Sequence, residues 1–377
     1  MTSSSQAVLR DATLDDALEI TAFLVRLGLA MPEGDEAVLD HWTRLWRTNP
    51  ALKAHGSNPA LGWVLEDGGR IVGFFGNIPQ VSYFDGRPVR VSSARAWAVD
   101  KGFRTETPRL CEAFFGQDTD LLLMSSGNES AGRRCLEYGS STMPQPDYGE
   151  ILYWVIDASG FLRAGLKKKG RGGVAAWFGG HLGALALNAQ MRLGGRRPYA
   201  PLDHIAITSV DEIDDGFDDL WARKLKEYPG RLLACRNAET LQWYFSLSQD
   251  SGRTRFICYR PQGRLEGYLA LVREDAPGIG LKRFKVADLF VAEDDPATLA
   301  ALLAAAYEYG VAKRCHVLEV VGLPQGLRAH VLAHKPYRRS MPTFPFFFKA
   351  LNPDLAAPLA AGDGWYVTAF DGDTALL

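Results

Sequence analysis

Residues 93–115 read SARAWAVDKGFRTETPRLCEAFF, and this stretch decides the fold that the sequence predicts. It begins inside a longer run, RPVRVSSARAWAVD, whose β-branched and aromatic residues are typical of a strand. After Thr107 and Pro108 the segment RLCEAFFGQ is typical of a helix, and proline suits the first turn of a helix. The stretch therefore predicts a strand, a polar loop and a helix in succession.

The residues before this stretch predict a helix followed by antiparallel strands. Apolar residues within 14–29 recur at three- and four-residue spacing, which predicts an amphipathic helix behind a short strand at 7–10. The runs GWVLE and RIVGFFGNI are typical of strands, and turn signals at 67–69 and 85–86 separate them from each other and from the long run. Turns this short predict an antiparallel meander.

The same order of elements occurs twice along the chain. After residue 115, the run TDLLLMSS predicts a buried strand, and ESAGRRCLEYG predicts a helix that ends at Gly139. The second half again predicts a hairpin, a strand, a helix and a strand between residues 255 and 322. Aligning Ile71 with Leu265, and Val99 with Val291, gives offsets of 194 and 192 residues, which indicates a repeated unit.

The sequence therefore predicts an α/β (α+β) protein with two similar domains, each a mixed, mainly antiparallel sheet flanked by helices. The 377 residues suffice for two cores. The apolar residues of 344–348 predict a last strand that closes the second sheet. The predicted boundaries are an N-terminal domain at 1–158, a connector with cationic ends at 159–200, a C-terminal domain at 201–350, and a tail at 351–377 that packs on the second domain.

Composition and charge exclude several classes of function. Lys plus Arg number 42 and Asp plus Glu 44, and the resulting net charge of −2 provides no general attraction for nucleic acid. The five cysteines contain no C-x-x-C pair and the seven histidines form no ligand set, so we expect no metal site. The sequence has no G-x-S-x-G elbow and no P-loop, which excludes serine hydrolases and nucleotide hydrolases of those types.

The N-terminal residues MTSSSQAVLRDAT lack the apolar core of a signal peptide. No uncharged run reaches the roughly 20 residues that cross a bilayer. We therefore expect a soluble, cytoplasmic protein.

Two segments resemble diagnostic motifs of the GNAT (acyl-CoA N-acyltransferase) superfamily. One is residues 93–115, and the other is SSGNESAGRRCLEYG at 125–139. In that superfamily the strand before the loop offers backbone groups to the pantetheine arm of an acyl-CoA, and a loop at a helix start binds its pyrophosphate. The resemblance implies that this chain transfers an acyl group from acetyl-CoA or another acyl-CoA to an amine.

The resemblance implies five coenzyme-binding residues. Ala98 and Val99 stand at the strand end that would contact the pantetheine arm. Arg104 opens the loop, and Thr105 and Thr107 could donate hydrogen bonds to phosphate. Thr107 stands where the family has a glycine, so side-chain donors would replace part of a backbone cradle. Free amides and the positive end of a helix favour an anion at this place.

The resemblance also implies candidates for the chemistry. Asn128 begins the N-x-x-A segment of the family's last catalytic helix, and Cys135 stands seven residues later, where the family often has a tyrosine as general acid. A thiol with a reference pKa of about 8.5 could donate the proton, or it could be a small buried hydrophobe. Asp100 is the candidate general base, and Glu66 and Glu150 also lie near expected strand ends.

The second half offers a weaker place for a coenzyme. Its corresponding loop, AEDDPATLAALL, has no glycine and no arginine, and its aspartates would repel a pyrophosphate. Asp288 and Glu319 lie on expected strands of this half. They could contact an acceptor in the groove between the domains, or they could bind buried polar groups.

Three short stretches resemble tandem-GNAT proteins of bacterial cell-surface polysaccharide functions: RNAETLQWYF at 236–245, MPTFPFFFKALNPDL at 341–355 and GDGWYVTAFDGDT at 362–374. The resemblance implies a small-molecule acceptor such as an amino sugar or a related precursor. Two alternatives stay open. One is a FemAB-like aminoacyltransferase, which the lack of a basic stripe disfavours, and the other is a non-catalytic binding or scaffold protein.

The connector contains the apolar run VAAWFGGHLGALALNAQM between lysine and arginine residues. It predicts a helix packed across the two domains. The alternative is a helix on a membrane surface, held by anionic lipid.

Overall fold

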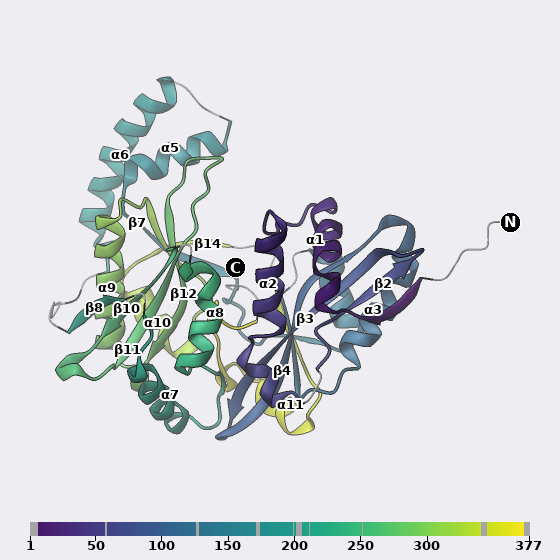
Figure 1. The fold of residues 1–377 in the computed structure, drawn as a ribbon. Helices are drawn as coiled ribbons and strands as arrows, with labels where there is room; N and C mark the ends of the chain where they lie inside the picture. Colours follow the sequence, from purple (N-terminus) through teal and green to yellow (C-terminus); the bar gives the residue numbers. More distant parts are fainter. Residues whose placement is uncertain are drawn as a thin grey trace.

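Two β-sheets, each flanked by helices, make up the protein (Figure 1). The computed structural model describes residues 7–56, 59–125, 128–170, 174–198, 200, 206–210, 212–250, 252–340 and 345–372. Within these residues both sheets are mainly antiparallel, and the predicted α/β class with two flanked sheets is confirmed.

The first sheet is built around a long hairpin of β3 (Arg70–Phe84) and β4 (Arg87–Val99). Asp85 and Gly86 join the two strands with φ angles of 49° and 70°, which a tight hairpin turn requires. The sheet order is β1-β2-β3-β4-β5-β15-β6, and β9 pairs with the far end of β3 and with β16. The other strands are β1 (Val8–Asp11), β2 (Gly62–Asp67), β5 (Leu121–Ser125), β6 (Ser141–Thr142), β9 (Leu232–Ala234), β15 (Phe346–Ala350) and β16 (Trp365–Tyr366).

The second sheet has the order β14-β7-β13-β12-β11-β10-β8. All its neighbours are antiparallel except β12 and β13, which pair in parallel as β4 and β5 do in the first sheet. Its strands are β7 (Glu150–Val155), β8 (Ile207–Val210), β10 (Thr254–Tyr259), β11 (Gly267–Arg273), β12 (Arg283–Val291), β13 (Val317–Val320) and β14 (Tyr337–Ser340).

Helices cover both faces of the first sheet because its side chains alternate between the two faces. Phe74 packs in one core cluster with α1 and α2, whereas Phe75 packs in another with α3. The helices are α1 (Ala17–Arg26), α2 (Asp35–Trp46), α3 (Thr107–Phe115), α4 (Glu129–Glu137), α5 (Ala158–Lys168), α6 (Val174–Gly194), α7 (Asp215–Glu227), α8 (Ala238–Asp250), α9 (Pro296–Ala312), α10 (Gln325–Ala333) and α11 (Pro353–Leu359).

Each sheet takes one strand from the other half of the chain. β7 precedes the connector, yet it pairs with β13 in the second sheet, where Val155 lies opposite Val317. β15 follows the last strand of the second sheet in the sequence, yet it pairs with β5 in the first sheet, where Phe348 lies opposite Leu123. The prediction that the strand within 344–348 closes the second sheet is therefore wrong. The domain boundaries stay a prediction. Each predicted domain contains one strand, β7 or β15, that pairs in the sheet of the other.

The connector forms a hairpin of α5 and α6 that projects from the second sheet (Figure 1). Its described side chains pack on that sheet, since Ala184 of α6 shares a small core with Val155 of β7. The guanidinium of Arg196 lies 4.6 Å from the centre of the Tyr337 ring on β14. These contacts place the described part of the hairpin on the second sheet. None of the helices in the described ranges combines the length and the apolar character that a membrane crossing requires.

One continuous core joins the two halves. Trp42 of α2 belongs to the same buried cluster as Phe217 of α7 and Phe256 of β10. The indole of Trp243 on α8 donates a hydrogen bond of 2.8 Å to the carbonyl of Arg44 on α2. Burying a large apolar side chain contributes about 1.5–3 kcal/mol. We infer that the two halves fold as one stable body.

His41 is an uncompensated polar group within this core. Its side chain on α2 is 5% exposed, and Nε2 has no hydrogen-bond partner among the described residues. Burial, helped by the positive charge of Arg95, lowers the pKa of His41 to about 4. The imidazole is therefore neutral in the folded protein over a range of pH in which an exposed histidine is protonated.

This difference predicts an acid-sensitive stability. Above pH 6.5 His41 is neutral in both the folded and the unfolded protein, so its protonation does not lower the free energy of unfolding. As the pH falls from about 6.5 to about 4, only the unfolded chain binds the proton, and about 3 kcal/mol of stability is lost. Urea unfolding of wild type and His41→Gln between pH 7.5 and pH 4.5 measures it. As the pH falls, the free energy of unfolding of the wild type should decrease relative to that of His41→Gln. Parallel curves of unfolding free energy against pH would contradict the assignment.

Candidate functional site

The first sheet opens where β4 and β5 separate. The two strands pair in parallel only from Val91 to Ser93, which lies opposite Leu123. Beyond Ser93, β4 continues to Val99 and pairs only with β3 among the described residues. Residues 94–99 are all partly exposed. Unpaired strand backbone is a ready donor and acceptor of hydrogen bonds, so this half of β4 can bind an extended ligand.

A β-bulge lies in the middle of this open half. The register shifts so that Phe74 faces Ala98 while Gly76 faces Arg95, which leaves an extra residue in β4. Ala96 has a φ angle of 51°, a conformation that costs energy for a residue with a side chain. β12 has a corresponding bulge at Ala287, because Ala270 faces Asp288 and the next pair is Leu271 with Val286. Bulges leave backbone groups without a strand partner.

The predicted coenzyme residues form one segment from the open strand to the start of α3. Ala98 and Val99 end β4, and the 3-10 helix η3 (Lys101–Glu106) carries Arg104 and Thr105 on its exposed surface. Thr107 is the first residue of α3. Within the described parts of the chain, the side chain of Arg104 has no ion pair or hydrogen bond. Its cation is therefore available for an anionic ligand near the positive end of α3.

Arg109 stands close by in the sequence but is already engaged. Its Nη1 donates to the carbonyl of Ala7 at 2.5 Å and to Glu106 at 2.8 Å. We therefore expect Arg109 to hold the chain near β1 and not to bind phosphate.

The second predicted motif begins α4. The side chain of Asn128 caps this helix, because its Oδ1 accepts a hydrogen bond of 2.9 Å from the amide of Ala131. Cys135 lies on the buried face of α4, where burial raises its pKa to about 11. Tyr138 stacks on Phe115 with ring centres 4.8 Å apart, and its hydroxyl donates to the carbonyl of Pro108. The motif thus fixes α4 against α3.

The three candidate bases occupy different surroundings. Asp100 follows β4 and accepts a hydrogen bond of 2.9 Å from Arg26, with Arg70 at 3.9 Å. Glu66 is paired with Arg10 at 2.8 Å. Glu150 lies in the second sheet and is bound by Arg328, so the exchange of strands places it outside the open half of β4. Asp100 alone stands beside the predicted coenzyme segment.

The corresponding opening of the second sheet is filled by the C-terminal tail. β12 pairs with β13 only from Arg283 to Val286, and residues 287–291 are all buried. The hydroxyl of Tyr366 donates a hydrogen bond of 2.9 Å to the carbonyl of Leu289 on β12. On the other side, Ala369 packs with Val321, which follows β13. The tail therefore lies between the two diverging strands.

A buried ionic network holds the tail there. Arg236 is fully buried and pairs with Asp288 of β12 at 3.0 Å and with Asp371 of the tail at 3.1 Å. Thr368 donates to Asp288 at 2.7 Å, and Tyr268 donates to the same carboxylate at 2.7 Å. Asp288 therefore binds buried polar groups and is not free for an acceptor. Glu319 is likewise engaged, by Arg339 and Arg283.

A cavity remains at the starts of α9 and α10 in the second domain, with a volume of about 930 Å³. Four carboxylates line it against one arginine, Arg231. Arg231 is already paired with Asp294 at 2.8 Å. Negative charge of this kind repels a pyrophosphate, as the loop sequence predicts. The four are Glu227, Glu293, Asp294 and Asp363.

Comparison with solved structures identifies the fold. A conserved protein of unknown function from Enterococcus faecalis V583, described as a probable N-acyltransferase, aligns with a TM-score of 0.57 and 10% identity over 92% of this chain and 73% of that one. The GCN5-related N-acetyltransferase of Anabaena variabilis aligns with a TM-score of 0.56 and 10% identity, over 92% of this chain and 73% of that one. The GCN5-related N-acetyltransferase of Kribbella flavida aligns with a TM-score of 0.54 and 11% identity, over 92% of this chain and 72% of that one. The chain has the GNAT fold. No protein-family model and no curated protein matches the sequence.

The coverage of these GNAT neighbours extends over both sheets, which is consistent with two GNAT-like domains. At 10–11% identity the likeness concerns the fold. A shared fold does not fix the function, which depends on the chain's own residues at the site. Among the described residues, no group of three or more His, Cys, Asp or Glu side chains is arranged to hold a metal ion.

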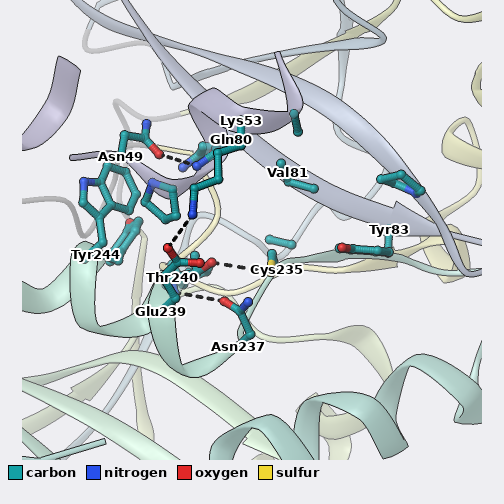
Figure 2. A pocket seen from close by; sticks show the side chains of 17 residues that line it. Asn49, Lys53, Gln80, Val81, Tyr83, Cys235, Asn237, Glu239, Thr240 and Tyr244 are labelled. Atoms are coloured by element: carbon teal, nitrogen blue, oxygen red, sulfur yellow. Dashed lines mark hydrogen bonds and ion pairs between the residues drawn. The ribbon is translucent and has the colours of Figure 1, made fainter. Parts of the chain in front are cut away.

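A cavity of about 380 Å³ lies between the two GNAT-like domains (Figure 2). The 3-10 helix η2 (Pro50–Ala54), the end of β3, the start of α8 and Phe370 of the tail line it. Its wall residue Gln80 accepts a hydrogen bond of 2.6 Å from Ser93, where β4 and β5 separate. Sequence reasoning expected an acceptor in a groove between the domains but named none of the residues that line this cavity, because its walls come from four distant segments. The only signal was the segment at 236–245, which forms part of the wall.

The packing of the tail against Gly322 yields a stability prediction. Gly322 has a φ angle of 64°, and a Cβ there would lie 2.9 Å from the carbonyl carbon of Thr368 and 3.1 Å from the amide nitrogen of Ala369. Gly322→Ala should destabilise the protein by about 2–4 kcal/mol, the sum of a positive-φ cost and overpacking. Urea unfolding measures the loss, and limited proteolysis measures release of the tail.

Gly86→Ala is the matched control. Gly86 has a similar φ angle of 70°, but nothing lies within 4 Å of its added Cβ. This variant should lose only the backbone cost, about 1–2 kcal/mol. Equal losses in the two variants, with the tail equally protected, would show that the tail does not pack as described.

Proposed function

We propose that the protein is an acyltransferase that binds acyl-CoA at the open half of β4 and transfers the acyl group to an amine of a small molecule. The observation that carries the proposal is the difference between the two like sheets. Residues 94–99 of β4 are partly exposed, whereas residues 287–291 of β12 are buried beneath the tail. A pantetheine arm needs the unpaired edge of a strand, and of the two strands that diverge from a parallel neighbour only β4 offers one within the described residues.

The coenzyme would lie along β4 and reach the start of α3. Backbone groups of Ala98 and Val99 are suited to the pantetheine arm, since this part of β4 has no neighbour toward β5. Arg104 is suited to the phosphates because it has no ion pair in the described structure. Thr105 and Thr107 add hydroxyl donors beside it. Acetyl-CoA or a longer acyl-CoA fits this arrangement as co-substrate.

In the proposed reaction the amine nitrogen attacks the thioester carbonyl carbon. The new C–N bond forms as the C–S bond breaks, and the thiolate leaves with the electron pair and takes up the proton that the amine loses. Holding the two reactants together supplies much of the rate, and backbone amides beside the bulge at Ala96 can polarise the carbonyl. Asp100 is the candidate acceptor of the amine's proton.

Cys135 is a poor donor for that thiolate. Its pKa of about 11 lies above the value of about 8.5 of an ordinary thiol, so proton transfer to the departing thiolate would be uphill. We therefore expect the proton to travel from the amine through water or Asp100. Cys135 and Asn128 would act by fixing α4, which borders the site.

The acceptor in this proposal is an amino sugar or a related precursor of a cell-surface polysaccharide, which the protein binds in the cytoplasm. The resemblance of residues 236–245, 341–355 and 362–374 to such proteins supports it. A non-catalytic binding protein is the second candidate. The observation in its favour is that Arg109 and Cys135, two groups that catalysis could use, are engaged or buried.

Acetyl-CoA binding tests the proposal directly. A ligand at 100 times its dissociation constant adds about 2.7 kcal/mol of stability, which a thermal-shift titration detects. Arg104→Ala should weaken the binding about tenfold or more, because a charge-assisted hydrogen bond to phosphate is lost. Lys313→Ala, at the end of α9 in the second domain, removes the same charge as a control and should leave the shift unchanged. Absence of a shift with every acyl-CoA would refute the donor site.

A further inference from the structure

Aromatic side chains form much of the wall of the cavity between the domains. Tyr83 of β3, Trp243 and Tyr244 of α8 and Phe370 of the tail bring four aromatic side chains to it. Figure 2 shows Tyr83 and Tyr244 at opposite ends of the cavity. Its volume of about 380 Å³ falls in the range of small-molecule sites, about 300–1,000 Å³. Flat rings of this kind pack against the C–H faces of a ring ligand.

The charge of the cavity excludes an anionic ligand. Lys53 and Glu239 are the charged side chains among the described residues that line it, and they pair with each other at 3.1 Å. Their side chains are 79% and 61% exposed, so the pair stands at the rim and leaves the interior neutral. A coenzyme with several phosphates would find no counter-charge here. The cavity is therefore suited to a ligand other than the acyl donor.

Hydrogen-bonding groups stand beside the aromatic rings. The Oδ1 of Asn237 accepts from the amide of Thr240, which leaves its Nδ2 as a donor without a partner among the described residues. Tyr83 adds a hydroxyl, which keeps its proton because burial raises its pKa. The Oγ1 of Thr240 donates to Cys235 and keeps its lone pairs for an incoming donor. Ring faces beside such groups match a sugar, which has C–H faces and a hydroxyl-bearing edge.

The cavity also lies next to the open strand. Gln80 lines it and binds Ser93, the last residue of β4 that pairs with β5. The Nε2 of Gln80 donates to the carbonyl of Gly372, so the tail and the open strand meet at the same wall. A ring in the cavity would therefore lie near Ser93, where the open half of β4 begins and where the proposed acyl-CoA site starts.

We propose that this cavity binds the hydroxyl-bearing ring of a sugar acceptor, with Trp243 as the stacking face and with Tyr83 and Asn237 as hydrogen-bond donors. The assignment rests on the proposed function for the role of the sugar as acceptor. Binding of the ring itself does not depend on the coenzyme. The two can therefore be tested separately.

The test is calorimetric titration of the protein without coenzyme. Glucosamine and N-acetylglucosamine are the ring probes, sorbitol is the open-chain control and phenethylamine is the apolar amine control. Both ring probes should bind at least tenfold more tightly than either control. Tighter binding of phenethylamine, or no binding of either sugar, would overturn the assignment.

Variants place the binding in this cavity. Tyr83→Phe with Asn237→Asp keeps the ring and the helix cap but removes both donors, and it should weaken N-acetylglucosamine binding about tenfold or more. Tyr259→Phe removes a hydroxyl outside the cavity and should bind as the wild type does. Equal affinity in the double variant and the wild type would overturn the assignment.

Acetyl-CoA titrations on the same samples separate the two proposals. If the wild type binds neither sugar but still shows the acetyl-CoA shift, the donor site stands and only the sugar site is removed. The reverse result removes the acyltransferase proposal and keeps the sugar site.

Discussion

The buried guanidinium of Arg236 ties the C-terminal tail to the second sheet. A charge taken from water into the interior costs several kcal/mol unless good partners surround it. Asp288 of β12 and Asp371 of the tail supply those partners, and both lie within 3.1 Å of Arg236. Removing the tail would leave Arg236 with only part of its counter-charge. The network therefore keeps residues 365–371 between β12 and β13, where the sheet would otherwise open.

The same constraint makes the two similar sheets differ where their parallel strands diverge. β4 and β12 each pair in parallel with a neighbour for a few residues, each has a bulge, and each then diverges. In the second domain the divergence is filled by the chain itself, and the helix starts beyond it are lined by carboxylates. In the first domain the strand edge is exposed and Arg104 stands beside it. We infer that one domain keeps the donor site while the other builds a wall of the acceptor cavity.

The sequence predicts the elements and their order, because periodicity and turn residues are local signals. The helix at α9, the hairpin turn at 85–86 and the strand β4 all lie where the pattern indicates them. The partners of β7 and β15 could not be predicted in this way, since EILYWV and FFFKA are both apolar strands that fit either sheet. A groove between the domains was expected, but the residues that line the cavity could not be named, as its walls meet only in the folded chain. The sequence names the contiguous segment 98–107 and, on α4, Asn128 and Cys135, and their roles stay a prediction.

We propose that acyl-CoA binds the first domain alone. Amide hydrogen exchange with and without saturating acetyl-CoA tests it most directly, because exchange reports protection of each backbone segment separately. With acetyl-CoA bound, amide exchange should be slower in peptides covering 94–110 and unchanged in peptides covering 287–299. Protection at 287–299, or none at 94–110, would contradict it.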